Sequence, residues 1–321
     1  MKTIFGKRDI KLNTGSIINK YGIYFILVLL LVLCSALSGN FFTVKNLLNI
    51  SRQISVTTMI ALCEMVLLIC GGINLSAGAQ LCLSGIISIY AYLATESVML
   101  AVVVAILVGS FLGVINGVIT CYLGVPAFIT TLATNMIFRG VINVWTGGQT
   151  IWGIGGYSIL GQGYIGIVPI PMIIMIIVVA LIGFITKNTI LGRRLLAIGG
   201  NQNAASASGV NVKMNTFIAF IISGALAGLA GAVHLSRLSM GIPTAGEGYE
   251  MDAIAGAVIG GTSMTGGVGS ALGVLIGSLI IGVINNILNL TNVTSYVQDI
   301  IKGLIIVVAV LLDIQTKRNF K

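Results

Sequence analysis

Residues 71–78 place three glycines, an amide and a hydroxyl between two strongly apolar stretches of the chain. They read Gly-Gly-Ile-Asn-Leu-Ser-Ala-Gly. A bilayer offers no hydrogen-bonding partner to backbone groups outside a helix. Irregular backbone at membrane depth therefore persists only where protein or a water-filled cavity satisfies those groups. We expect a broken helix that lines a path, so transport is the first functional hypothesis.

The composition indicates a protein that is embedded in lipid. Hydrophobic residues make up 57% of the 321 residues and charged residues only 8%, against about 25% charged residues in an ordinary globular chain. The sequence predicts an all-α integral membrane protein with about ten transmembrane helices, of which the second and eighth are candidates for re-entrant or split helices. The expected spans are residues 21–38, 52–70, 79–95, 97–121, 127–145, 167–186, 215–235, 251–263, 270–291 and 295–313.

Most of the 17 lysines and arginines lie in three segments: before the first span, between the sixth and seventh spans, and after the last. An even number of spans puts these segments on one side, which the positive-inside rule makes the cytoplasm. We expect a cytoplasmic segment 1–20, one permease domain 21–313 with a cytoplasmic loop at about 187–214, and a cytoplasmic tail 314–321. Nucleic-acid binding is not expected, because the cations are dispersed among the spans.

Several kinds of chemistry are excluded by what the sequence lacks. The five cysteines lie in apolar spans and form no metal-ligand spacing with the single histidine, so they are interpreted as small apolar filler. No phosphate-binding loop occurs, and the GxGxxG at residues 161–166 follows no strand. We therefore expect no metal site, no bound cofactor and no catalysis by this chain, and any ATP dependence must come from a partner.

Glycines repeat at every fourth position in three spans: Gly109, Gly113 and Gly117; Gly224 and Gly228; Gly273 and Gly277. Such spacing allows helix backbones to approach closely inside a membrane. These residues are predicted to build the helix bundle.

Polar side chains inside the apolar spans are the candidates for a substrate path. Asn74 suits either a contact with sugar hydroxyls or a cap for the following helix. Glu64 is costly in lipid, so it is expected to face the bundle, either paired with Arg139 or lining a cavity. The other polar residues of this group are candidates for the path or for hydrogen bonds between helices: Ser76, Gln80, Asn135, Asn285 and Asn286.

The cytoplasmic loop contains two glycine-bounded pieces around an alanine-rich stretch. We expect a short helix that starts near Asn201 or Asn203, is capped by an amide and ends at Gly209. This element is either an ordinary loop between spans or a rigid protruding helix that another protein binds.

In order along the chain, from about residue 40 to 313, several motifs resemble the permeases of the ribose-type, simple-sugar ABC importer family. They are GGINLSAG (71–78), VPAFITTL (125–132), RG (139–140), GGN to SGV (199–210), SGALAGLAG (223–231), GYEMDAIA (248–255), GGTSMTGGVG (260–269) and NNILNL (285–290).

The resemblance implies a dimer of identical or different permeases in the bacterial cytoplasmic or inner membrane. Cytoplasmic ATPase subunits would drive it, and an external sugar-binding protein would supply it. ATP would be used only by those partners. The coupling element would comprise Gly192, Arg193, Arg194, Asn201, Ala204, Ala205, Ser208 and Gly209. One departure from the family is Asn74, where an aspartate is usual.

Charged residues expected on the outer side suit either docking of the binding protein or anchoring at the interface: Lys45, Arg52, Arg237, Glu247 and Glu250. Ribose is the expected substrate, with other monosaccharides and the furanosyl quorum signal as competitors. A secondary transporter that uses Glu64 as its ion- or proton-coupling carboxylate, and a membrane scaffold without transport, are the alternatives.

Overall fold

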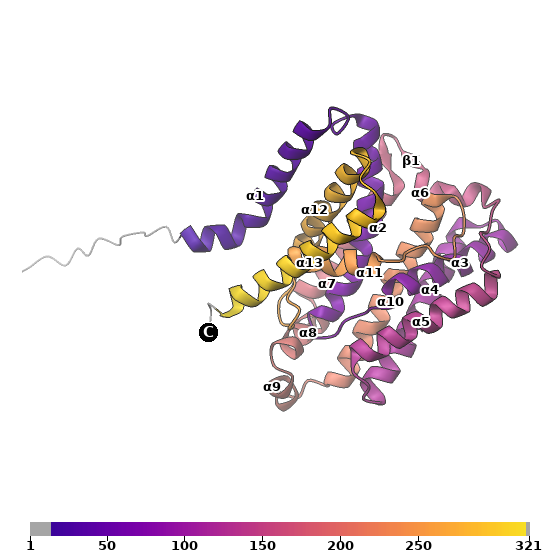
Figure 1. The fold of residues 1–321 in the computed structure, drawn as a ribbon. Coiled ribbons are helices and arrows are strands. Elements are labelled where there is room, and N and C mark those ends of the chain that lie inside the picture. The colour runs from indigo at the N-terminus through magenta and orange to yellow at the C-terminus, as the bar shows by residue number, and fades with distance from the viewer. Residues whose placement is uncertain (1–13, 319–321) are drawn as a thin grey trace, which may run out of the picture.

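The computed structural model describes residues 14–318 and is almost entirely helical (Figure 1). The long helices are α1 (Thr14–Leu37), α2 (Val44–Leu68), α3 (Ala77–Thr95), α4 (Val98–Gly117), α5 (Ala127–Thr146), α7 (Ile170–Asn188), α10 (Val212–Leu238), α12 (Ala271–Leu290) and α13 (Ser295–Arg318). The shorter elements are η1 (Val118–Tyr122), η2 (Gly155–Ser158), α6 (Ile159–Gln162), β1 (Tyr164–Ile165), β2 (Val168–Pro169), α8 (Ile190–Gly200), α9 (Gln202–Ala207) and α11 (Tyr249–Ile259).

Seven helices among the described residues are long and apolar enough to cross a membrane: α2, α3, α4 with η1, α5, α7, α10 and α12. They match seven of the ten spans expected from the sequence. The second span is not split, because α2 runs unbroken for 25 residues. The eighth is short as expected, since α11 has only 11 residues. The chain is therefore a multi-pass, all-helical membrane protein.

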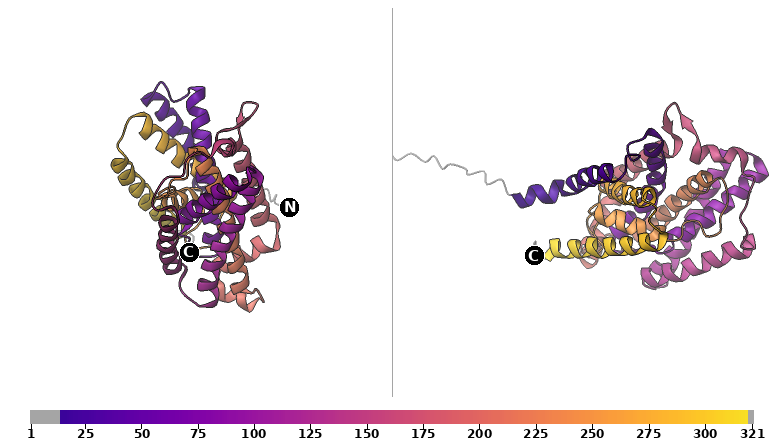
Figure 2. Two further views of the ribbon diagram at one scale, coloured as in Figure 1. Left: turned by 90° about the vertical axis from the view of Figure 1, so that its right-hand side faces the viewer. Right: turned by 45° about the horizontal axis from the view of Figure 1, so that its top comes forward.

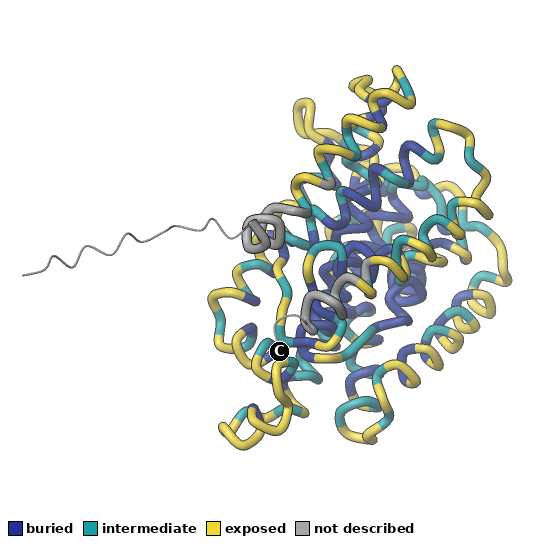
Figure 3. The backbone as a smooth tube through the Cα atoms, turned by 60° about the vertical axis from the view of Figure 1, so that its left-hand side comes forward, coloured by how far each residue is buried: buried dark blue, intermediate teal, exposed yellow. Residues whose placement is uncertain are grey.

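The bundle is built around α2 and α10. Helix α10 packs against α4, α3 and α2, and α2 packs against α11, α12 and α7. The most apolar part of α2 is 83% buried, whereas the corresponding parts of α4 and α5 are only 28% buried. Figure 3 shows the same gradient, with buried backbone at the centre and exposed backbone on the outside. The polar residues in the middle of α2 and α10 consequently lie inside protein, and the outer helices present apolar side chains to lipid.

Helices α1 and α13 lie on one side of this bundle (Figures 1 and 2). Helix α1 packs on α12, and α13 packs on α11. One end of the bundle carries the two-stranded antiparallel hairpin β1–β2, which the sequence analysis did not predict, and the opposite end carries α9 (Figure 1). We call these the hairpin end and the α9 end.

Glycines set the contact between α4 and α10, as the four-residue spacing predicts. A Cβ added at Gly109 would strike the backbone of Gly224 and Gly228, and one added at Gly113 would strike the backbone at Phe220. The same holds for Gly273 and Gly277, whose neighbours are backbone atoms of Gly256 in α11 and of Gly260, the residue directly after α11. The two helix pairs can approach this closely only without side chains at these positions.

We predict that Gly109→Leu lowers the amount of folded protein and its thermal midpoint in detergent. The new side chain meets backbone, so the cost lies at or above the ~1–3 kcal/mol typical of overpacking. Gly140→Leu is the matched control, because Gly140 is an exposed glycine of α5 with no atom near its Cβ position. Equal thermal midpoints for the two variants would contradict the proposed role of the contact.

Candidate functional site

Residues 69–76 form a connection between two separate helices, so they are not an interruption of one helix. Helix α2 ends at Leu68, Gly71 adopts a left-handed conformation with φ of 83°, and α3 begins at Ala77. From Asn74 to Ser76 this connection is buried. It therefore folds into the bundle, as irregular backbone at membrane depth must.

Asn74 is the centre of the hydrogen bonds that hold this connection. Its backbone N–H donates to Oε2 of Glu64 at 3.2 Å, and its Nδ2 donates to Oε1 of Gln80 and to Oγ of Ser223, each at 3.0 Å. Its Oδ1 accepts from the N–H of Ser76 at 3.2 Å and from the Ser76 hydroxyl at 2.7 Å. Both ends of the amide are thus used within the protein, and the contact with Ser76 supports the turn that leads into α3.

The network continues into two further helices. Nδ2 of Asn116, on α4, donates to Oγ of Ser76 at 2.8 Å, and Oγ of Ser223, on α10, lies 3.0 Å from Sγ of Cys63. All of these side chains are 0% exposed. We call the set Cys63, Glu64, Asn74, Ser76, Gln80, Asn116 and Ser223 the buried polar cluster. It joins α2, α3, α4 and α10 across the middle of the bundle.

Three members of the cluster were missed by sequence reasoning. Cys63 was interpreted as apolar filler, and Ser223 was treated only as part of a motif. Asn116 had a usable signal, because it is an amide inside the otherwise apolar α4 and lies next to Gly117 of the glycine repeat.

Some polar atoms of the cluster have no hydrogen-bond partner within the described residues. They are Oε1 of Glu64, Nε2 of Gln80 and Oδ1 of Asn116. Buried polar groups are usually paired, so these atoms have the capacity to bind a further group. On α5, Oδ1 of Asn135 is also buried without a partner.

The expected pairing of Glu64 with Arg139 is wrong. Arg139 instead donates from Nη1 to the carbonyl oxygens of Pro243 at 3.3 Å and Ala245 at 2.8 Å. The carbonyls of the irregular segment before α11 are within its reach, whereas Glu64 is occupied by the backbone of Asn74. Arg139 therefore fastens α5 to this segment.

Asn285 and Asn286 make hydrogen bonds between helices, as one of their two alternatives expects, and a role for them in the path stays a prediction. Nδ2 of Asn286 donates to Oδ1 of Asn46 at 2.8 Å, and the reverse bond is 3.0 Å long. Nδ2 of Asn285 donates at 3.2 Å to Oδ2 of Asp252, which also pairs with Nζ of Lys302 at 3.2 Å. The sequence analysis did not predict this ion pair between α11 and α13.

At the α9 end, the predicted short helix is confirmed. Oδ1 of Asn201 accepts from the N–H of Ala204 at 2.9 Å and caps α9, and Gly209 follows the helix with φ of 82°. Six of the eight expected coupling residues are exposed: Arg193, Arg194, Asn201, Ala204, Ser208 and Gly209. The other two, Gly192 and Ala205, are buried, so they pack inside the protein.

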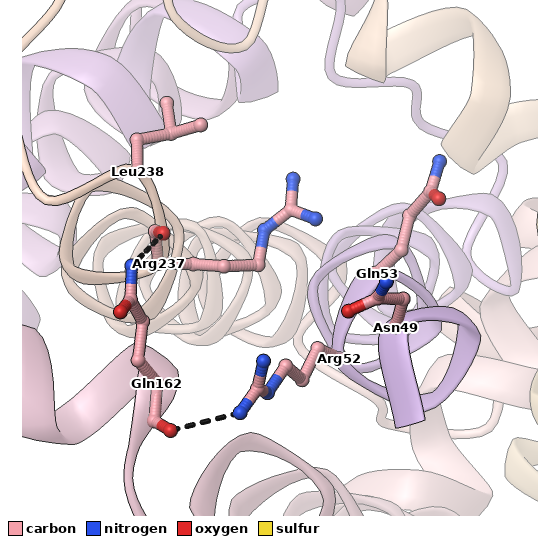
Figure 4. Close-up of a pocket in the computed structure, with 6 residues that line it drawn as sticks. All are labelled: Asn49, Arg52, Gln53, Gln162, Arg237 and Leu238. Carbon is pink, nitrogen blue, oxygen red and sulfur yellow. Dashed lines mark hydrogen bonds between the residues drawn. The ribbon is translucent and has the colours of Figure 1, made fainter. Parts of the chain in front are cut away.

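The five charged residues expected on the outer side do not form one cluster. Lys45 and Glu247 are exposed, and the half-buried Glu250 places its Oε2 against Gly78. Arg52 and Arg237 lie together and line a single pocket between α2, α6 and α10 (Figure 4). Among residues 14–318 no group of histidines, cysteines and carboxylates could hold a metal ion, and all five cysteines are free thiols.

Residues 46–310 match the family model described as branched-chain amino acid transport system / permease component. The chain belongs to this family of transport-system permeases. No solved structure matches the chain.

Three named relatives resemble the chain over nearly its whole length. The ribose import permease protein of Haemophilus influenzae is 44% identical over 89% of this chain and 90% of its own. The D-allose transport system permease protein of Escherichia coli K12 is 42% identical over 92% and 91%. The ribose import permease protein of Bacillus subtilis 168 is 40% identical over 94% and 95%.

We predict that Asn74→Leu destabilises the protein, because it leaves Ser76, Gln80 and Ser223 without their shared partner. Each buried polar group left unsatisfied costs about 1–3 kcal/mol. The readouts are the thermal midpoint and the amount of inserted protein.

Asn74→Asp keeps the acceptor for Ser76, so it should lower the thermal midpoint and the amount of inserted protein less than Asn74→Leu does. Asn143→Leu, at an exposed amide on α5, is the control and should change neither readout. An Asn74→Leu protein as stable as this control would disprove the central position of Asn74.

Proposed function

We propose that this chain is the transmembrane permease subunit of an ATP-driven importer for a monosaccharide, with ribose as the best candidate. The observation that carries the proposal is the identity of 40–44% to ribose import permeases over about nine-tenths of the chain. Named allose and galactose permeases are 42% and 35% identical to this chain. Other monosaccharides are therefore the competing substrates.

ATP hydrolysis is assigned to partner subunits in the cytoplasm. The sequence has no phosphate-binding loop, and α9 presents a capped, exposed helix that another protein could bind. We assign the coupling contact to the exposed face of α9 and to the exposed Arg193 and Arg194. The buried Gly192 and Ala205 would support this surface from inside.

The proposed topology has ten spans with both termini in the cytoplasm. It treats α1, α11 and α13 as membrane-embedded in addition to the seven long apolar helices. The basic residues beside α8 and α9, among them Lys187 and Lys213, support a cytoplasmic α9 end. The hairpin end then faces outward, and the exposed Lys45 and Glu247 would be available to a sugar-binding protein.

The substrate path is proposed to pass along the buried polar cluster. Its unpaired atoms on Glu64 and Gln80, together with Oδ1 of Asn135 on α5, have the capacity to exchange hydrogen bonds with sugar hydroxyls. In the structure the cluster is closed, with its members 0% exposed. Access would therefore require α5 or α10 to move away from the connection between α2 and α3, driven by ATP at the partner subunits.

A second copy of this chain or a related permease would complete the importer. A secondary transporter with Glu64 as coupling carboxylate is not favoured, because the relatives of highest identity reported above are named as import or transport-system permeases.

Uptake into reconstituted vesicles that contain the permease, its ATPase and its binding protein tests the proposal. Labelled ribose should accumulate when ATP is present on the ATPase side, and a panel of allose, galactose and glucose ranks the alternatives. Accumulation of none of these sugars by a complex that hydrolyses ATP would reject a monosaccharide importer.

We predict that Ala204→Glu weakens binding of the ATPase subunit about tenfold or more while the permease remains as stable as wild type. The residue is exposed in the first turn of α9, where a carboxylate interacts favourably with the helix dipole and should not destabilise the helix. Its charge and size would nevertheless obstruct a tight contact.

Gln149→Glu, which adds the same charge in an exposed loop after α5, is the control and should bind the ATPase normally. Normal ATPase affinity of the Ala204→Glu permease would remove α9 from the interface.

A further inference from the structure

A pocket of about 360 Å³ opens at the hairpin end between α2, α6 and α10 (Figure 4). The six residues that line it are Asn49, Arg52, Gln53, Gln162, Arg237 and Leu238. Two of them carry a positive charge, three are amides, and none is acidic.

Gln162 forms a hydrogen bond with the side chain of Arg52 and another with the backbone of Arg237. Nη2 of Arg52 donates to the carbonyl oxygen of Gln162 at 2.9 Å, and Nε2 of Gln162 donates to the carbonyl oxygen of Arg237 at 3.0 Å. The guanidinium of Arg52 also lies over the ring of Tyr164, 4.6 Å from its centroid. The surrounding structure therefore sets the position of the Arg52 side chain and of the Arg237 backbone before any ligand arrives.

The charges of this pocket are uncompensated within the described residues. The ion pair found among them joins Lys302 to Asp252 and involves neither arginine. The Nε atoms of Arg52 and Arg237 are both buried without a hydrogen-bond partner. Two guanidinium groups beside one cavity repel each other, and an oxyanion with several acceptor oxygens would satisfy both of them.

In the proposed topology the pocket lies at the level where helices leave the membrane. Arg237 and Leu238 are the last two residues of α10, and Tyr164 begins the hairpin that leads into α7. The hairpin exposes apolar side chains, with Ile165 64% and Ile167 87% exposed. A tyrosine beside an arginine at the end of a span is typical of the headgroup region of a bilayer.

The next helix provides a surface for acyl chains. Helix α7 is only one-third buried and exposes a row of large apolar residues, among them Ile176, Ile177, Leu181 and Phe184. A lipid whose phosphate occupies the pocket could therefore lay its chains along the hairpin and α7.

We propose that the Arg52–Arg237 pocket binds the phosphate of a phospholipid headgroup from the leaflet at the hairpin end. An anionic lipid such as phosphatidylglycerol fits best, because its headgroup carries no positive charge to oppose the two arginines. This site is separate from the proposed sugar path and from the ATPase contact. It would anchor the outer ends of α2 and α10 in the membrane.

Native mass spectrometry of the purified, delipidated permease tests the proposal with dioleoyl-phosphatidylglycerol as the probe. The wild-type permease should retain one tightly bound lipid. The double variant Arg52→Gln with Arg237→Gln should bind it at least about tenfold more weakly, since charge-assisted hydrogen bonds are lost. Lys45→Gln, which removes an exposed charge of α2 outside the pocket, should bind as wild type.

The remaining arms separate the possible sources of the anion. Each Arg→Lys single variant keeps the charge but loses the bidentate guanidinium donor, so its lipid affinity should fall between those of the wild type and the double variant. Thermal midpoints establish that all variants are folded. Glycerophosphoglycerol, the headgroup without chains, and inorganic phosphate should compete only weakly.

Unchanged lipid binding by a folded double variant would overturn the proposal. Competition by the soluble phosphates as strong as that by the lipid would also overturn it, in favour of a site for free phosphate. Loss of binding-protein affinity without loss of lipid would assign the pocket to a carboxylate of that partner instead. The lipid measurement needs neither ATP nor sugar, so its outcome is independent of the proposed transport function.

Discussion

The structure depends on one requirement, which is that irregular backbone inside a bilayer must find its hydrogen bonds within the protein. The connection between α2 and α3 meets this requirement through Asn74, whose amide and backbone bond to Glu64, Ser76, Gln80 and Ser223. Water is not needed at these atoms, so the connection can be buried. The cost of burying so many polar groups is offset only while all four contributing helices stay in place.

Small residues make that arrangement possible. Ser223 reaches Asn74 because α10 lies close to its neighbours, and this approach relies on Gly224 and Gly228 against the backbone of α4. Ser223 of the polar cluster and Gly224 of the glycine contact are thus consecutive residues of α10. Any movement of α10 that opened a path would have to break both at once.

Local patterns predicted local features well. The lengths of the apolar stretches predicted seven helices that are long enough to span a membrane. The four-residue glycine spacing predicted close helix packing, and the amide at Asn201 predicted the cap of α9. Contacts between residues far apart in sequence were beyond reach, because a local sequence pattern does not show which helices become neighbours. The ion pair of Asp252 with Lys302, the contact of Ser223 with Asn74, and the placement of Arg139 on backbone carbonyls all belong to this second kind.

The proposed function attributes sugar movement to ATP hydrolysis by partner subunits. The most direct test is the driving force of uptake in vesicles that contain the complete importer. With ATP supplied and a protonophore present, ribose should accumulate at an undiminished rate, and without ATP an imposed proton or sodium gradient should produce none. Accumulation driven by such a gradient in vesicles that contain the permease alone would contradict the account and make Glu64 the group to examine.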